Sequence, residues 1–232
     1  MKLQQFPYSS DNLSYVIYGE HSALAIDGGA VASILDFVNK NKLTLTHVTH
    51  THLHPDHTCG TQELLAGSGA TLLDGAFLSG HAQIEFDGLT IGVHATPGHT
   101  DDSVTFHVGN CLITGDTLFN GTIGNCFSGD IQAFYNSIKF LMAFPGDTLV
   151  YAGHDYLKYA MSFTRIIEPD NPDIDPYLKS YNPAHVCSRL GDELKVNPYL
   201  RFNDSRFIEI LKKKNLPVST EFQRWESVMS LG

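Results

Sequence analysis

Apolar runs separated by turn-forming residues divide the first two thirds of the chain into short segments. Residues 13–18 (LSYVIY) and 22–27 (SALAID) have the composition of strands and flank Gly-Glu-His, which predicts a β-hairpin. Residues 30–39 carry apolar side chains at helical spacing and predict a helix. Similar patterns predict strands at 45–50, 71–73, 89–95, 103–108, 111–114 and 148–152, and helices at 57–65 and 131–144. This mixed order is typical of helices that cover stacked sheets.

The pattern changes after about residue 166. The segment IEPDNPDIDPYLKSYNP (167–183) contains four prolines and no strand pattern, which predicts a linker or long loop. Helical patterns follow at 184–195, 205–214 and 219–229. At the start of the last one, Ser219 is the expected N-cap, and one face carries Phe222, Trp225 and Val228. We therefore divide the chain into a first domain over residues 1–166 and a helical region over residues 167–232.

Composition and charge narrow the classes of partner. Hydrophobic residues make up 42% of the 232 residues, which is enough for a substantial core. The net charge of −10 argues against nucleic acid as a partner. We expect no signal peptide and no membrane span, because no long apolar run is present. The four cysteines are far apart and form no CxxC, so we expect reduced thiols and a cytoplasmic protein.

A dense cluster of chelating side chains occupies residues 50–57, HTHLHPDH. His52, His54 and Asp56 alternate, so that an extended or looping segment projects all three toward one side. His57 adds a fourth chelator at the start of the predicted helix. Neutral imidazoles with a carboxylate suit zinc and neighbouring first-row metals. On this segment alone, a solvated His-rich loop remains an alternative.

Three later strands each end with a glycine followed by a potential ligand. These pairs are Gly98-His99, Gly115-Asp116 and Gly153-His154. Glycine permits a tight backbone, so the ligand is presented where the strand ends. Together with HxHxDH these residues make seven ligands, which is too many for one open tetrahedral ion and suits two. The sequence therefore predicts a dinuclear metal site, whereas His50, in the strand before the motif, is expected to be a structural hydrogen-bonding residue.

The motifs THLHPDH, TPGHT, TGDTLF and YAGHDY together resemble the metallo-β-lactamase superfamily. The segments GDTLFNGTIGNCFSGD, GHDYLKYAMSFTRIIEPDN and LGDELKVNPYLR resemble its glyoxalase II (hydroxyacylglutathione hydrolase) branch, so that the resemblance covers nearly the whole chain. It implies an α/β fold, the αββα four-layer metallo-β-lactamase sandwich, with the metals at one edge. It also implies that the C-terminal helices form a small substrate-binding region.

The resemblance further implies the ligand set. It assigns His52, His54 and His99 to one metal and Asp56, His57 and His154 to the other, while Asp116 bridges the two. The expected cofactors are two divalent metal ions, with zinc expected and iron or manganese open. The implied reaction is attack of a metal-bridging hydroxide on the carbonyl of a thioester, with an S-acylglutathione such as S-lactoylglutathione as the leading substrate. The catalytic carboxylates, Asp56 and Asp116, act in this scheme as ligands rather than as general bases.

Recognition of the thiol carrier departs from the family pattern. The resemblance assigns substrate contacts to Tyr156, Asn125, Phe127 and Arg224. Asn125 stands where the family has a basic residue, so a cation is lost there. Cys59 stands where related enzymes often have glycine, and we expect a small packing residue rather than a reactive thiolate. Arg201, in NPYLR, is expected to brace the helical region.

Three alternative functions stay open. The first is hydrolysis of a thioester of another acyl-thiol carrier, and the second is a mononuclear-iron persulfide dioxygenase. In the third, the metals are structural and the C-terminal helices bind a protein, although seven ligands form an open rather than a closed site. The acyl group, the metal bound in the cell and the state as monomer or dimer are not determined by the sequence.

Overall fold

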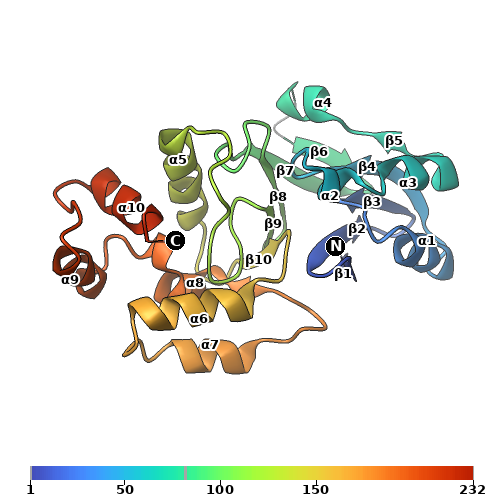
Figure 1. The fold of residues 1–232 in the computed structure, drawn as a ribbon. Coiled ribbons are helices and arrows are strands. Elements are labelled where there is room, and N and C mark those ends of the chain that lie inside the picture. Colours follow the sequence, from blue (N-terminus) through green and yellow to red (C-terminus); the bar gives the residue numbers. More distant parts are fainter. Residues whose placement is uncertain (1, 81–82, 232) are drawn as a thin grey trace.

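Two facing β-sheets with helices outside both make up the main body of the protein (Figure 1). The structure is a computed structural model that describes residues 2–80 and 83–231. Helices α1 (Val31–Lys40) and α3 (Thr61–Ser68) flank one sheet, and α5 (Ile131–Met142) flanks the other. This arrangement confirms the predicted four-layer sandwich. The C-terminal helices lie at the end of the molecule that carries α5 (Figure 1).

The first sheet has the strand order β1-β2-β3-β4-β5. Its strands are β1 (Lys2–Tyr8), β2 (Asn12–Tyr18), β3 (Ser22–Ile26), β4 (Thr44–Thr49) and β5 (Thr71–Leu72). The β2–β3 pair is antiparallel and confirms the predicted hairpin. Successive residues of a strand face opposite sides of the sheet. In β3, Leu24 and Ile26 therefore join the core between the sheets, whereas Ala23 and Ala25 pack with α1 and α3.

The second sheet has the order β11-β10-β9-β8-β7-β6. Its strands are β6 (Gln83–Phe86), β7 (Leu89–Ala95), β8 (Val104–Val108), β9 (Cys111–Gly115), β10 (Leu149–Ala152) and β11 (Ser188–Arg189). Phe106 and Ile113 face the first sheet, and Leu112 and Val150 face α5. Both faces are thus covered, which explains why β9 and β10 read as nearly continuous apolar runs.

The prediction of one continuous helix over residues 57–65 is wrong. The structure has α2 (Pro55–Thr58) and then α3, with Cys59 and Gly60 between them. A Cβ atom at Gly60 would lie 2.1 Å from the backbone oxygen of Gly28. The chain is therefore pressed against the end of β3 here, and this contact with a distant segment is not visible in the local pattern.

Several elements lie outside the predicted ones: β1, β6, α4 (Gly75–Gly80) and α6 (Leu157–Ile167). In β1 the alternation is obscured because Gln5 is a buried polar residue. Its side-chain amide bonds the backbone of Val186, at 2.8 Å to the carbonyl oxygen and 2.7 Å from the amide nitrogen. Local propensity cannot reveal a partner 181 residues away.

The C-terminal region contains α7 (Ile174–Ser180), α8 (Leu190–Val196), the short 3₁₀ helix η1 (Pro198–Leu200), α9 (Ser205–Lys213) and α10 (Glu221–Met229). The predicted linker at 167–183 is wrong in part, because α7 forms within it. Pro176 occupies the first turn of α7, where the missing N–H is tolerated. The helix predicted at 184–195 begins only at Leu190, because Ser188 and Arg189 pair with β10 instead.

Helix α10 has the apolar face that the sequence predicts. Trp225 and Val228 are buried, and Phe222 packs against the same core. The expected N-cap is wrong by one residue: Thr220 caps the helix and forms a capping box with Gln223. The division at residue 166 stays a prediction, since β11 returns from the helical region to the second sheet. Within residues 2–80 and 83–231, no helix combines the length and apolar character needed to cross a membrane.

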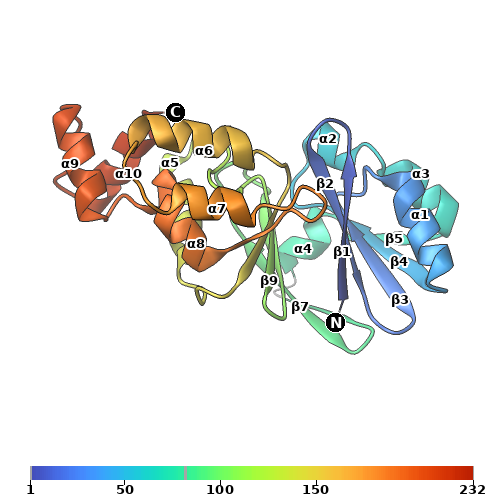
Figure 2. The same cartoon turned by 90° about the horizontal axis from the view of Figure 1, so that it is seen from below.

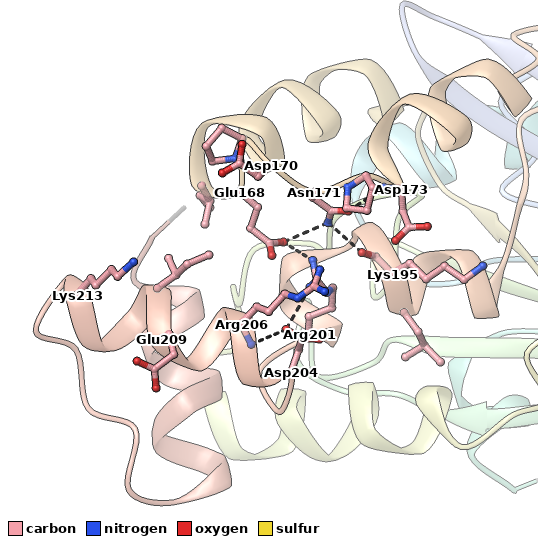
Figure 3. Close-up of a pocket in the computed structure, with 15 residues that line it drawn as sticks. Glu168, Asp170, Asn171, Asp173, Lys195, Arg201, Asp204, Arg206, Glu209 and Lys213 are labelled. Atoms are coloured by element: carbon pink, nitrogen blue, oxygen red, sulfur yellow. Dashed lines mark hydrogen bonds and ion pairs between the residues drawn. The ribbon is translucent and has the colours of Figure 1, made fainter.

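A cavity of about 760 Å³ lies between the C-terminal end of α6, α8 and α9 (Figure 3). On its wall Arg201 forms a buried ion pair with Glu168 and reaches Asp204 at 3.3 Å. Asn171 donates hydrogen bonds to Glu168 and to the backbone oxygen of Lys195. These bonds join three segments and confirm that Arg201 braces the helical region. None of the seven predicted ligands lines this cavity.

Candidate metal centre

The seven predicted ligands lie together at one edge of the two sheets, where the strands that carry them end. His52 and His54 follow β4, and Asp56 and His57 lie in α2. The other three follow strands of the second sheet, namely His99 after β7, Asp116 after β9 and His154 after β10. The ligand atoms fall into two groups within which all atoms are at most 4.8 Å apart.

The first group comprises His52, His54, His99 and Asp116. The Nδ1 atom of His54 is 2.9 Å from Nε2 of His52 and 3.1 Å from Nε2 of His99. Oδ2 of Asp116 lies 3.5 Å from Nε2 of His99 and 3.9 Å from Nε2 of His52. Three ring nitrogens and one carboxylate oxygen therefore converge on the same small space.

The second group comprises Asp56, His57 and His154. The Nε2 atoms of His57 and His154 are 3.3 Å apart, and Oδ2 of Asp56 is 3.6 Å and 3.3 Å from them. Asp116 also reaches this group, since its Oδ1 is 3.4 Å from Nε2 of His57 and its Oδ2 is 3.5 Å from Nε2 of His154. The Asp116 carboxylate is thus placed between the two groups.

Glycine makes room for Asp116 at two places. Gly115 has a φ of +51°, and a Cβ atom there would lie 2.4 Å from Oγ1 of Thr51. A Cβ atom at Gly153 would lie 2.2 Å from Oδ1 of Asp116. Any larger residue would displace this carboxylate or the loop behind it. The glycines found before these ligands therefore have the steric role that the sequence predicts.

The cluster is compatible with a dinuclear metal site. Oδ1 of Asp116 is buried and accepts no hydrogen bond from the described residues. A buried oxygen without a hydrogen-bond partner is unfavourable. The ring nitrogens that face one another here cannot all be hydrogen-bonded, because a neutral imidazole carries a proton on only one of its two nitrogens. A cation would satisfy both, and imidazole with carboxylate is a donor set of zinc and neighbouring first-row metals. The residues present therefore fit such ions.

Electrostatics in the cluster follow from burial and close charges. Burial raises the pKa of Asp116, but the neighbouring His154 and His57 lower it more strongly, so its pKa is well below the usual range. Burial lowers the pKa of His57, yet Asp27 and Asp116 raise it to about 11. The carboxylates of Asp27 and Asp116 therefore favour a proton on His57. Because only neutral imidazole binds a metal, that proton leaves when a cation binds.

Asp27 is a functional residue that the sequence patterns did not single out. Its carboxylate is fully buried and lies 3.0 Å from Nδ1 of His57. It also accepts hydrogen bonds from the backbone N–H and the hydroxyl of Thr51, at 2.8 and 2.7 Å. A carboxylate on the outer nitrogen of a histidine fixes the ring for ligation. The signal was present, because Asp27 follows a strand and precedes Gly28, but Asp-Gly also marks ordinary turns.

His50 lies outside both ligand groups. Its Nε2 is 2.6 Å from the hydroxyl oxygen of Thr61 at the start of α3. This bond joins the end of β4 to α3, which confirms the structural role expected for His50. The exposed thiol of Cys59 contacts the backbone oxygen of Asp56 at 3.2 Å, and it belongs to neither group.

Two of the four predicted substrate contacts line a cavity of about 280 Å³. These are Tyr156, whose ring stacks on His154 with centroids 5.0 Å apart, and Asn125. The remaining lining residues are aromatic, small or uncharged polar: Phe119, Thr122, Ile123, Gly124, Tyr159, Ala160, Phe163 and Tyr199. No charged side chain lines this cavity in the described parts of the chain.

The other two predicted contacts lie elsewhere. Phe127 is 65% exposed, and its ring contacts the rings of His54 and His99 at centroid distances of 5.6 and 5.2 Å. The guanidinium of Arg224 donates to the backbone oxygens of Phe202 and Val218 and to Oδ1 of Asn203. The structure thus places Phe127 beside the first ligand group and Arg224 within the helical region.

Comparison with known proteins gives consistent matches. Residues 67–154 match the model of the metallo-beta-lactamase superfamily, and residues 155–228 match that of the hydroxyacylglutathione hydrolase C-terminus. A hydroxyacylglutathione hydrolase of Pseudoalteromonas translucida is 32% identical over 96% of this chain and 93% of that protein. One of Tolumonas auensis is 35% identical over 87% and 86%.

Solved structures agree on the fold. The crystal structure of ETHE1 from Myxococcus xanthus has a TM-score of 0.68 and 28% identity, and the match covers 98% of this chain and 100% of that one. A metallo-beta-lactamase from Staphylococcus aureus has a TM-score of 0.68 at 20% identity, over 98% of this chain and 72% of that one. The similarity therefore extends across both the sandwich and the C-terminal helices.

Proposed function

The chain belongs to the hydroxyacylglutathione hydrolases of the metallo-β-lactamase superfamily, and on that premise we propose that it hydrolyses S-acylglutathione thioesters such as S-lactoylglutathione. The observation that carries this proposal is the convergence of seven ligand side chains in two adjacent groups. A mononuclear-iron persulfide dioxygenase is not favoured, because the second ligand group and the match of the C-terminal third both point to the hydrolase.

The cation ligands follow from the two groups. We assign His52, His54 and His99 to one divalent ion, Asp56, His57 and His154 to the other, and Asp116 to both. When bound, the ions supply hydroxide at neutral pH, because coordination lowers the pKa of water from 15.7 to about 7, and they polarise the thioester carbonyl. We propose zinc as the metal, with iron or manganese as substitutes, since all three suit this donor set.

The chain's own residues position the reacting groups. Asp56 and Asp116 act as ligands, and Asp27 holds the His57 ring so that Nε2 faces the cluster. Hydrolysis adds hydroxide to the carbonyl carbon, breaks the carbon–sulfur bond and releases a carboxylate and the thiol of glutathione. A thiolate is a good leaving group, so a separate nucleophilic serine or cysteine is not required.

The carrier part of the substrate is proposed to occupy the 280 Å³ cavity beside His154. Tyr156 lines this cavity and stacks on His154 of the second ligand group, and Asn125 is another lining residue. Phe127 is proposed to face the acyl side, because it contacts His54 and His99. For Arg224 we propose no direct contact, since its guanidinium is already bonded within the helical region.

We propose that the enzyme acts in the cytoplasm. Its four cysteines are all free thiols, which suits a reducing compartment with a glutathione pool. A small-molecule thioester is then the partner, and neither the charge of −10 nor the uncharged cavity favours a nucleic acid.

A direct test is thiol release from S-lactoylglutathione by zinc-loaded protein, beside an acyl-coenzyme A thioester. We expect a kcat/KM above about 10⁴ M⁻¹ s⁻¹ for the glutathione thioester, which is the lower end of ordinary enzyme values. The value for the coenzyme A thioester should be lower. Protein with its full metal content that releases no thiol from either compound would rule the proposal out.

Because the cavity is uncharged, we expect that adding one positive charge to it strengthens substrate binding. Glutathione carries two carboxylates, and Asn125 is an exposed residue at the cavity. Asn125→Lys should lower the KM for S-lactoylglutathione by a factor of about 1.4 to 5, since an exposed ion pair contributes roughly 0.2–1 kcal/mol. The effect should shrink at high salt.

The matched control is Asn136→Lys, which adds the same charge on the exposed side of α5. Its KM should equal that of the wild type. Equal KM values for Asn125→Lys and wild type at low salt would show that the carrier carboxylates do not lie near Asn125.

A further inference from the structure

Residues 9–12 (SSDN), which are the turn between β1 and β2 together with the first residue of β2, lie against the second ligand group. Figure 2 shows this end of the β1–β2 hairpin next to α2, which carries Asp56 and His57. Ser9 has a φ of +51°, which lets the chain reverse sharply at this point. We call residues 9–12 the N-terminal turn.

Asp11 contacts two consecutive residues of the loop after β10. Its side chain contacts His154, and its backbone contacts Asp155. Its Oδ1 accepts a hydrogen bond of 2.8 Å from Nδ1 of His154, the ring nitrogen that points away from the ligand group. Its backbone oxygen accepts from the N–H of Asp155 at 2.8 Å. A carboxylate in this place fixes the ring orientation and the proton on Nδ1, so that Nε2, which lies 3.4 Å from Nδ2 of Asn12, keeps its lone pair for a cation.

Asn12 contacts Asp56, the exposed member of the group. Its Nδ2 donates a 2.9 Å hydrogen bond to Oδ2 of Asp56, the oxygen that faces His57 and His154. Asn12 is buried, whereas the Asp56 side chain is 47% exposed and has rotational freedom to lose. A carboxylate oxygen has two lone pairs, so it can accept this bond and still bind a cation.

The N-terminal turn has no such contact with the first group. His52 Nδ1 is instead 3.1 Å from the Thr51 hydroxyl, and His99 Nδ1 is 2.9 Å from the backbone oxygen of Asn125. In the parts of the chain that the structure describes, residues 9–12 make no hydrogen bond or ion pair with His52, His54 or His99. The two ligand groups are therefore held in place by hydrogen bonds from different segments of the chain.

We propose that Asp11 and Asn12 are positioning residues that set the affinity of the second cation and leave that of the first unchanged. The inference rests on the two cation sites of the proposed function. It also gives the β1–β2 hairpin a role in the site: this hairpin belongs to the first sheet, yet it orients a ligand that follows β10 of the second sheet. Loss of partners of this kind typically weakens metal binding 10- to 100-fold.

The test is a zinc titration of metal-free protein against a chromophoric chelator. Wild type should bind two equivalents. In Asp11→Ala one equivalent should keep its affinity, while the other, bound by the second ligand group, should weaken about 10- to 100-fold. Asp11→Asn, which keeps an acceptor oxygen but loses the charge, should weaken that same equivalent less than Asp11→Ala.

The matched control is Asp87→Ala. Asp87 is also a turn carboxylate, and it accepts hydrogen bonds from the backbone N–H groups of His21 and Ser22 at the next hairpin of the same sheet. Both variants lose one charge, but Asp87→Ala should bind both zinc equivalents as wild type does. The thermal midpoints of the metal-free variants should be similar to each other.

Equal weakening of both equivalents in Asp11→Ala, no weakening of either equivalent, or a single equivalent in the wild type would each overturn the proposal. The readout is independent of turnover. If the wild type binds two zinc ions but releases no thiol, and Asp11→Ala loses the second ion, the positioning role stands and the proposed hydrolase function fails.

Discussion

Replacing Asp116 by asparagine is expected to lower the kcat/KM for S-lactoylglutathione by about 10³-fold or more. The Asp116 carboxylate lies within 3.5 Å of nitrogens in His57, His99 and His154, so that it belongs to both ligand groups. Asparagine has nearly the same shape but lacks the negative charge that holds two cations. Cation-dependent stabilisation of the transition state is worth several kcal/mol, and each 1.36 kcal/mol changes the rate tenfold.

The measurement combines kinetics with the metal content of the same sample. The matched control is Asp101→Asn, which removes an exposed carboxylate two residues after His99 that is not a predicted ligand. It should keep its activity within about twofold, as surface substitutions change free energies by roughly 0.5 kcal/mol or less. A folded Asp116→Asn protein that retains two metal ions and more than a tenth of the activity would contradict the role of Asp116.

Trp225→Ala is expected to lower the free energy of unfolding by about 3–5 kcal/mol, the usual range for a buried aromatic residue. Trp225 is fully buried between α10 and α5, with its ring 5.7 Å from those of Phe134 and Tyr135. Its Nε1 has no hydrogen-bond partner in the described chain, so the loss is one of packing. Trp225→Phe keeps a ring in this place and should lose clearly less.

Denaturant unfolding followed by circular dichroism measures both variants, because the chain has only one tryptophan and fluorescence would lose its probe. A loss below about 1 kcal/mol for Trp225→Ala, an ordinary value for any point substitution, would show that α10 is not an integral part of the core.

Helix α10 is connected to the candidate metal centre through α5, which packs against both Trp225 and the loop before His99. A Cβ atom at Gly98 would lie 2.3 Å from the Phe134 ring, and the Ser137 hydroxyl donates to the backbone oxygen of Pro97 at 2.7 Å. Helix α5 therefore supports the loop that presents His99. This contact explains how the helical region contributes to the site without supplying a cation ligand.

Four of the seven residues could be predicted from the dense HxHxDH segment, and the other three, His99, Asp116 and His154, because each follows the same local arrangement. A buried strand ends, a glycine allows a tight backbone, and a histidine or aspartate comes next, as at Gly115-Asp116 and Gly153-His154. Strand ends of a layered fold meet at a common edge, so that residues far apart in sequence come together. The structure brings the seven predicted residues into two adjacent groups, and their role as cation ligands stays a prediction.

The partners of the ligands could not be read in this way. Asp27 has the appearance of an Asp-Gly turn, and Asp11 and Asn12 that of a polar hairpin turn. Their roles depend on contacts with His57, His154 and Asp56 across 30, 143 and 44 residues of sequence, respectively. For Arg224 the resemblance implies a substrate contact, which stays a prediction, and the structure shows its side chain bonded to backbone oxygens of the helical region.

The 280 Å³ cavity that we propose for the carrier was likewise not predictable from the sequence patterns. Its aromatic wall combines Tyr159 and Phe163 of α6 with Tyr199 of η1, and α6 was not among the predicted helices. The buried residues of α6 do lie at helical spacing, at Leu157, Ala160, Met161, Thr164 and Ile167. The four prolines in the segment 167–183 indicate a loop, and for this reason neither α6 nor α7 was predicted.

Anomalous diffraction at the zinc edge, from crystals of zinc-loaded wild-type protein, tests the pairing of cations most directly. We expect two separate peaks, one surrounded by His52, His54 and His99 and the other by Asp56, His57 and His154, with the Asp116 carboxylate between them. One peak in this region, or two peaks bound by other side chains, would contradict the account.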